Sequence, residues 1–403
     1  MKDKPKYSIM IPVNNVRNYL PGTIDSIIKQ NYHNYELIIS DDSSTDGTAE
    51  YIDTLDNPII KVLHTPRRMT TAEHFDWVQT HAQGTWQIFL GGDDGLQPYF
   101  FMLADKLTDI AGKKNLRAIA SRRAYFFWNG CETVYGDMAI SYSAEKKIYV
   151  CDSKKETLKT LYGKKDYFEL AQMYMSSLFH CSLILEVRSK QKGRFLTYEV
   201  ADANMAAIST LYEKQYLQCE IPLGWVGTSP KRLRTNDEFA DLVTRTMPRV
   251  CGDYRIGSLS LYFWGALNSV LQFRPECATY INNEQFVKKM LPYVYLEISN
   301  DASFKESKKY TFFQQLLEIN KVSFRYIRRR IFYIKCKNKL LTVFLFPRRC
   351  VRFVLRKIHL VKTVNNVWIQ FTWSEFPTMT YSKANEIVMG KIINDIHNIF
   401  KTE

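Results

Sequence analysis

Residues 86–94 read Trp86-Gln87-Ile88-Phe89-Leu90-Gly91-Gly92-Asp93-Asp94, an apolar run that ends in two carboxylates. A short continuous apolar run of this kind is typical of a buried strand. Because adjacent carboxylates repel one another, a fold that places them together at a strand end tends to supply a counter-cation. Hard oxygen ligands suit Mg²⁺ or Mn²⁺ that carries a phosphate. The alternative is a solvated Asp-Asp turn.

The chain before this run alternates expected strands with expected helices. In chain order we expect strand 7–13, helix 19–30, strand 35–40, helix 45–52, strand 59–63 and helix 71–81. This alternation predicts parallel βαβ units of an α/β fold. Ligands of such sheets bind beyond the carboxyl ends of the strands. Both acid pairs, Asp41-Asp42 and Asp93-Asp94, fall at such ends.

Two long, ordered segments resemble the N-terminal signature of family 2 glycosyltransferases. The first begins SIMIPVNN at Ser8 and continues through Leu20, Ser26-Ile27 and Gln30, and the second, residues 35–48, reads YELIISDDSSTDGT. The resemblance covers residues 7–230. It implies the GT-A fold, a mostly parallel sheet flanked by helices. It also implies metal-dependent, inverting transfer of a hexosyl or N-acetylhexosaminyl group from a nucleotide-sugar, with a UDP-sugar as the expected donor.

The resemblance also implies which residues bind the donor. Pro12, Val13 and Asn14 would lie beside the nucleotide base. Asp42, next to Asp41, resembles the aspartate that hydrogen-bonds the pyrimidine. A carboxylate suits the N3–H of uracil because it accepts hydrogen bonds without donating any. The acceptor would be a hydroxyl of a glycan or of a lipid-linked saccharide, as in cell-surface polysaccharide synthesis.

The pair Asp93-Asp94 matches the acidic metal-binding motif of this family. The resemblance implies that Asp94 reaches a Mn²⁺ or Mg²⁺ ion and that Asp93 lies by the ribose or the sugar. The ion would stabilise the departing diphosphate. Many family members have a third acid in this motif, and this chain has Gly95 there instead.

Inverting transfer also needs a general base that deprotonates the acceptor hydroxyl. Asp202 resembles the second acidic element of the family, an acid that opens a helix about 100 residues after the metal motif. The positive helix N-terminus would hold it ionised. Glu199 is the second choice. The alternative is that Asp202 merely caps the helix of residues 203–212.

Other candidates are cations and one histidine. Arg67 and Arg68 follow the third strand, where this family often has a cation that contacts base or phosphate. Lys231 and Arg232 lie in a loop that could meet the pyrophosphate. His180 follows an expected strand aimed at the acceptor side. The alternatives are solvated basic loops and a core histidine.

The segment from Ile319 to Trp373 is strongly basic. It contains fourteen Lys or Arg and no acid, so the other 41 basic residues balance the 41 acidic ones and the segment carries the net charge of +14. Two stretches have the residue spacing of amphipathic helices. The apolar face of the first contains Phe324, Ile327, Ile331 and Ile334, and that of the second contains Val351, Val354, Leu355 and Ile358. We predict that residues 321–362 dock on an anionic membrane. The alternative is a helical bundle packed on the catalytic domain. Nucleic acid is not expected, because no binding motif accompanies the charge.

We therefore predict a GT-A catalytic domain over 1–230, a helical region over 231–320 and a basic amphipathic region over 321–403. Further strands are expected at 118–127 and 178–185, and further helices at 245–273 and 283–318. Neither a signal peptide nor an apolar run of about 18 residues is present. We expect a cytoplasmic protein that is peripheral at the inner face of the membrane, with no prediction of oligomeric state.

Two other functions fit parts of the pattern. A nucleotidyltransferase-like enzyme has a similar sheet and acidic metal site, but the expected Gly-rich phosphate loop is missing at residues 12–15. A non-catalytic scaffold would keep the fold as a nucleotide-sugar-binding module. The ordered set Asp42, Asp94 and Asp202 argues against the scaffold.

Overall fold

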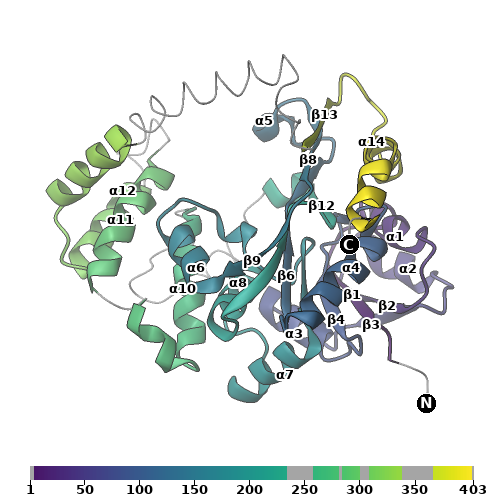
Figure 1. Cartoon of the computed structure of the whole chain (residues 1–403), viewed down its shortest axis with the longest axis horizontal. Helices are drawn as coiled ribbons and strands as arrows, with labels where there is room; N and C mark the ends of the chain where they lie inside the picture. The colour runs from purple at the N-terminus through teal and green to yellow at the C-terminus, as the bar shows by residue number, and fades with distance from the viewer. Residues whose placement is uncertain (1–3, 234–256, 281–283, 300–307, 338–365, 402–403) are drawn as a thin grey trace.

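The computed structural model describes residues 4–233, 257–280, 284–299, 308–337 and 366–401. A twisted eight-stranded sheet forms its centre (Figure 1). In spatial order the strands are β3 (Ile60–His64), β2 (Tyr35–Asp41), β1 (Tyr7–Val13), β4 (Trp86–Phe89), β10 (Ser177–His180), β6 (Ala118–Ser121), β11 (Gln215–Cys219) and β9 (Ile148–Asp152).

The N-terminal half of this sheet is parallel. β1 pairs with β2 and β4, and β2 pairs with β3, all in parallel. The helices α1 (Leu20–Ile28), α2 (Thr48–Asp53) and α3 (Thr71–Gln79) connect these strands. The predicted βαβ alternation is confirmed, and so is the mixed α/β class. Because β1, β2 and β4 run the same way, their carboxyl ends meet at one edge of the sheet.

A second sheet has five strands, in the order β13-β8-β7-β12-β5. It contains the short strand β5 that directly follows the acid pair. Its strands are β13 (Asn366–Thr372), β8 (Met138–Glu145), β7 (Ala124–Phe127), β12 (Gly224–Thr228) and β5 (Gly95–Leu96). Strand β12 pairs with β5 on one side and with β7 on the other. This sheet therefore holds the acidic loop against a strand more than 120 residues away in sequence.

Two apolar cores cover the two faces of the large sheet. Alternate residues of β1 point into different cores, because successive side chains of a strand face opposite ways. Met10 joins one core, and Ile9 and Ile11 join the other. The first core includes α3, α6 (Ser153–Leu161), α7 (Cys181–Lys190), α8 (Ala201–Tyr212), α10 (Leu259–Leu271), α11 (Glu284–Ile298) and α12 (Lys308–Ile319). The second includes α1, α2, α4 (Phe100–Lys113) and α14 (Tyr381–Lys401).

The expected strand at 178–185 is wrong beyond residue 180. Strand β10 ends at His180, and residues 181–190 form α7. The His180 side chain accepts a hydrogen bond from Ser182 N and so caps this helix. A short apolar run does not distinguish a strand from a buried helix, and the cap decides for the helix here.

The predicted boundary at residue 230 does not separate independent parts. Helix α10 packs on α8, and both belong to one continuous core. Near the other end of the chain, β13 pairs with β8, and α14 packs on α1 (Figure 1). Residues on both sides of the boundary bury shared apolar surface, so the C-terminal residues 366–392 belong to the same body as the N-terminal sheet.

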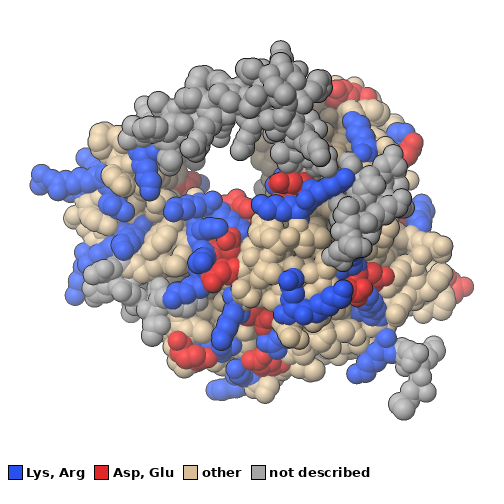
Figure 2. Space-filling model, in the orientation of Figure 1, with Lys and Arg blue, Asp and Glu red and all other residues tan. Residues whose placement is uncertain are grey.

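Residues 324–337 form a basic helix beside α12. Its predicted membrane face is instead a protein-packing face, because Ile327, Ile331 and Ile334 are buried against the first core or its edge. Lys and Arg side chains gather at this edge of the molecule (Figure 2). The second predicted amphipathic stretch, with Val351 to Ile358, lies outside the described residues. Among the helices that the structure describes, none has the length and apolar character needed to cross a bilayer.

Candidate active site

A cavity of about 570 Å³ opens at the carboxyl ends of β1, β2 and β4. It collects most of the residues that the sequence singles out. Those that line it are Pro12, Val13, Asn14, Asp42, Arg68, Asp93, Asp94, Glu199, Asp202 and Lys231. A larger cavity of about 950 Å³, between α1, α4 and α14, is lined by none of these residues.

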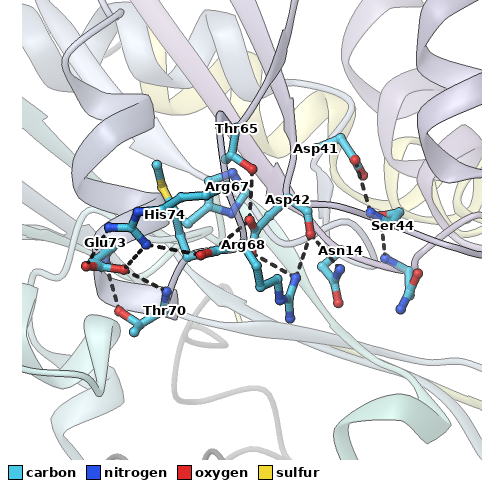
Figure 3. Close-up of polar contacts among 12 residues, drawn as sticks. Asn14, Asp41, Asp42, Ser44, Thr65, Arg67, Arg68, Thr70, Glu73 and His74 are labelled. Atoms are coloured by element: carbon cyan, nitrogen blue, oxygen red, sulfur yellow. Dashed lines mark hydrogen bonds and ion pairs between the residues drawn. The ribbon is translucent and has the colours of Figure 1, made fainter.

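Asp42 follows β2 and is held on both carboxylate oxygens (Figure 3). Its Oδ1 accepts from Thr65 Oγ1 at 2.9 Å and from Met69 N at 3.0 Å. Its Oδ2 forms an ion pair with Arg68 Nη1 at 2.8 Å. Asp42 is 3% exposed, so this network fixes the carboxylate at the cavity wall. A nucleobase N–H that approaches Asp42 must share it with Arg68 or displace the guanidinium.

The neighbours of this pair have structural roles. Arg67 pairs with Glu73 at 3.1 Å, and the Glu73 side chain also completes the capping box of α3 with Thr70 (Figure 3). Asp41 is buried, and its Oδ2 accepts from Ser44 N at 3.1 Å. Its Oδ1 has no hydrogen-bond partner within the described part of the chain. Asp41 lies behind the cavity wall and does not line the cavity.

Asp93 and Asp94 occupy the loop between β4 and β5 and differ in their surroundings. Asp94 is 1% exposed, and its oxygens accept from Gly91 N at 2.6 Å and from Gly227 N at 2.8 Å. Asp94 therefore stabilises the loop through its bond with Gly91 and links the loop to β12 through its bond with Gly227. Asp93 is half-buried and lines the cavity. Both carboxylates therefore line the cavity, and Asp93 is the more exposed of the two.

Asp202 lies in the first turn of α8 and forms part of the cavity wall. The N-cap residue is Val200, yet the Asp202 carboxylate still accepts a hydrogen bond from one of the first N–H groups of the helix, so the structural and the catalytic role both fit this residue. Tyr167 donates to Asp202 at 3.2 Å, and Ala203 N donates to its Oδ1 at 2.8 Å. Both bonds hold the carboxylate in place.

Glu199 lines the same wall and has a different environment. Burial raises its pKa, although hydrogen bonds with Thr70 and Ala72 oppose that shift. Its Oε2 is buried with no hydrogen-bond partner among the described residues. A carboxyl group with a raised pKa in a cavity is a candidate for proton transfer. The structure therefore keeps Glu199 as the second choice of base.

Lys231 closes one side of the cavity. It lies in η2 (Pro230–Leu233) and donates to the backbone oxygens of Asn14 and Asn15. The ammonium group thus links this turn to the loop after β1. Arg232 belongs to the same turn, and its side chain lies outside the described residues.

His180 is the candidate that the structure does not bring to the cavity. It pairs with Trp86, the first residue of β4, whereas the acid pair follows the other end of that strand. Its ring makes an edge contact with Trp86 and caps α7. Because β10 runs antiparallel to β4, its carboxyl end lies at the far edge of the sheet, so the acceptor-side prediction is wrong.

The cavity also contains residues that the sequence did not point to. His74, on α3, bonds Ser40 Oγ at 2.8 Å, and burial lowers its pKa to about 4. It is therefore neutral at physiological pH. Tyr174 lines the cavity next to the acidic loop. Neither residue belongs to a recognisable motif, and their position follows from packing alone.

Comparison with known proteins finds the family in the N-terminal part of the chain. Residues 8–124 match the family model described as "Glycosyl transferase family 2". A "PGL/p-HBAD biosynthesis glycosyltransferase" of Mycobacterium bovis is 33% identical over 27% of this chain and 41% of its own length. An "Uncharacterized glycosyltransferase" of Haemophilus influenzae is 36% identical over 26% of this chain and 40% of its own length.

A solved structure aligns with more of the chain at low identity. The crystal structure of S. aureus TarS 1-349 in complex with UDP-GlcNAc covers 81% of this chain and 88% of that chain, at 13% identity and a TM-score of 0.49. The matched stretch spans about two fifths of the length of the curated relatives. The likeness to glycosyl transferase family 2 therefore lies in residues 8–124, which contain β1, β2, β4 and the acid pair.

Proposed function

We propose that this protein is an inverting glycosyltransferase that moves a sugar from a nucleotide-sugar to a hydroxyl of a glycan or lipid-linked acceptor. The observation that carries the proposal is the convergence of Asp42, Asp93 and Asp202 on one cavity. These carboxylates come from three separate segments, and the first two lie within the stretch that matches the family. Relatives that are named as biosynthesis glycosyltransferases, for PGL/p-HBAD and for teichuronic acid, support saccharide biosynthesis as the setting.

The donor would lie along the edge formed by β1, β2 and β4. Asp42 and Arg68 would meet the base, with the pyrimidine N–H accepted by Asp42 and UDP as the expected nucleotide. Lys231 would meet the diphosphate as a point charge at the mouth of the cavity. Asp93 and Asp202, which line the same cavity, would then lie near the sugar.

The residues present fit a Mn²⁺ or Mg²⁺ ion. No group of three or more Asp, Glu, His or Cys that could hold a metal occurs in the ranges that the structure describes. Such ions need no full protein cage, because they are bound by one or two carboxylates together with substrate phosphates and water. We assign the ion to Asp93, with Asp94 shaping the loop. When bound, the ion would neutralise charge on the diphosphate leaving group.

Asp202 would act as the general base. The acceptor oxygen attacks the anomeric carbon from the side opposite the diphosphate, and the bond from that carbon to the diphosphate oxygen breaks. The acceptor proton passes to Asp202, and the nucleoside diphosphate leaves with the electron pair. Tyr167 orients the carboxylate through its hydroxyl.

A donor screen tests the proposal. We expect one nucleotide-sugar, from a panel of UDP-, GDP- and CDP-sugars, to release nucleoside diphosphate with Mn²⁺ present and not with EDTA. Hydrolysis in the absence of acceptor suffices as the first readout. Calorimetric binding of a UDP-sugar with no turnover on any acceptor would favour the non-catalytic scaffold. Release of pyrophosphate from a nucleoside triphosphate and a sugar 1-phosphate, with no release of nucleoside diphosphate from the panel, would favour a nucleotidyltransferase.

We also propose that the basic helix of residues 324–337 docks on an anionic membrane surface, through a face other than the predicted one. Phe332 and Tyr333 are 71% and 56% exposed on this helix. Arg325, Arg328 and Arg329 are exposed on the same helix, which carries no acid. Exposed aromatic side chains among cations suit the interface of an anionic bilayer. An acceptor anchored in that leaflet would then lie near the enzyme.

Liposome flotation tests the docking. We expect the wild type to float with phosphatidylglycerol vesicles at low salt and not with phosphatidylcholine vesicles. Each near-surface cation contributes about 1 kcal/mol, so the Arg328→Ala/Arg329→Ala variant should partition roughly 30-fold less. Lys113→Ala/Lys114→Ala removes the same charge from the exposed end of α4 and serves as the matched control. Equal flotation of the two variants would refute docking through the exposed face of residues 324–337.

A further inference from the structure

Tyr381, the first residue of α14, reaches the acidic loop from the C-terminal part of the chain. Its hydroxyl donates to the backbone oxygen of Asp93, a residue 288 positions earlier. Trp128 Nε1 donates to the same oxygen at 2.9 Å. Two donors from different elements therefore hold the Asp93 carbonyl, and Tyr381 is 3% exposed.

The tyrosine ring occupies the space that a side chain at residue 95 would need. A Cβ built at Gly95 would lie 3.2 Å from two atoms of the Tyr381 ring. A Cβ built at Gly22 would lie 3.4 Å from the same ring. The ring also packs on Phe126, with centroids 4.3 Å apart. The glycine at the third position of the acidic motif thus makes room for an aromatic ring from α14.

The next turn of α14 holds the same region. Asn385 Oδ1 accepts from Trp225 Nε1 at 2.7 Å, and Trp225 pairs with Gly95 between β12 and β5. At Gly227 any Cβ would collide with the Asp93 carbonyl oxygen. The loop is therefore enclosed by β12 on one side and by α14 on the other. Little freedom is left to the Asp93 peptide while both are in place.

We propose that Tyr381 is a positioning residue for Asp93, and that the first turns of α14 are part of the metal–diphosphate site. The proposal rests on the function proposed above. The direction of the Asp93 side chain depends on the orientation of its own peptide, and Tyr381 fixes that peptide through the carbonyl. Groups that orient a metal ligand typically contribute 10- to 100-fold to metal affinity.

The Tyr381→Phe variant tests this directly, because it removes the hydroxyl and keeps the ring that fills the space beside Gly95. We expect the Kd of Mn²⁺, measured by calorimetry with saturating UDP, to rise about 10- to 100-fold. The KM for Mn²⁺ should rise with it, and excess Mn²⁺ should restore most of kcat. Trp128 still donates to the Asp93 carbonyl, so the variant should fold, which thermal unfolding checks.

Tyr142→Phe is the matched control. Tyr142 is buried in the same core and its ring packs on Trp225, but its hydroxyl bonds that of Tyr99 at 2.7 Å and not the Asp93 carbonyl. It should leave the Kd of Mn²⁺ within twofold of wild type. A wild-type Mn²⁺ affinity in Tyr381→Phe, or an equal loss in Tyr142→Phe, overturns the proposal. If the wild type itself binds no Mn²⁺ with UDP or GDP, the proposed metal-dependent function fails first, and this inference fails with it.

Discussion

Replacing Asp202 by Asn is expected to lower kcat by about 10²- to 10⁴-fold, the usual contribution of a general base. The amide keeps the shape of the side chain but cannot take the acceptor proton. Donor binding should change little, because Asp202 belongs to α8, whereas Asp42 and Arg68, which would meet the base, follow β2 and β3. Initial rates with varied donor would show a fall in kcat at nearly constant KM, with released nucleoside diphosphate as the readout.

Glu199→Gln is the comparison variant for this experiment. Glu199 lines the same wall, and burial raises its pKa. If Glu199 is the base, the large loss falls on Glu199→Gln instead. The acidic limb of kcat/KM against pH would then lie above the ordinary range of a carboxyl group, since activity requires its ionised form. If neither variant loses more than tenfold, the cavity does not use a carboxylate base.

Replacing Asp93 by Asn is expected to lower kcat/KM by about 10³-fold with Mn²⁺ present. A bound metal contributes several kcal/mol of charge stabilisation, and about 4 kcal/mol corresponds to this factor. The residual activity should no longer respond to Mn²⁺. Titration of activity against Mn²⁺, and of Mn²⁺ binding with UDP present, would measure both effects.

Two further variants serve as the control and the comparison for Asp93→Asn. Asp109→Asn changes an exposed acid on α4 and should behave as wild type. Asp94→Asn should mainly lower the midpoint of thermal unfolding. Each oxygen of Asp94 accepts one backbone N–H, and the amide nitrogen that replaces one of these oxygens cannot accept a hydrogen bond. If Asp94→Asn abolishes the Mn²⁺ response at an unchanged midpoint, the ion belongs to Asp94, as the family resemblance implies.

The sequence predicts that Asp42 and Asp93 meet because parallel strands end at one edge of a sheet, whereas Asp202, in the first turn of α8, is predicted from the family resemblance alone. That rule needs strand identity and direction, and β1, β2 and β4 are unambiguous apolar runs. The same reasoning fails at His180, because the direction of β10 depends on its partners. It also cannot say which of Asp93 and Asp94 is the more exposed, because that depends on the hydrogen bonds that Asp94 accepts from Gly91 N and Gly227 N.

The contacts of the C-terminal residues 366–401 with the N-terminal sheets are what the sequence predicts least well. The pairing of β13 with β8 and the contact of Tyr381 with Asp93 join residues more than 200 positions apart. No local propensity encodes such contacts. Gly95 is a local sign of the contact with Tyr381, because a glycine in place of an acid leaves room for the Tyr381 ring. The pattern of residues 324–334 predicted a helix with an apolar face correctly, but not what that face packs against.

The hydrogen bond from Tyr381 to Asp93 has a consequence for how the protein is made. Synthesis proceeds from the N-terminus, and the parallel strands can assemble as soon as they leave the ribosome. The acidic loop cannot be enclosed until α14 has also emerged, nearly 300 residues later. Contacts of such long sequence separation form late in folding. A nascent chain would therefore carry the family signature without a finished donor site, and the ability to bind donor would appear only after α14 has been translated.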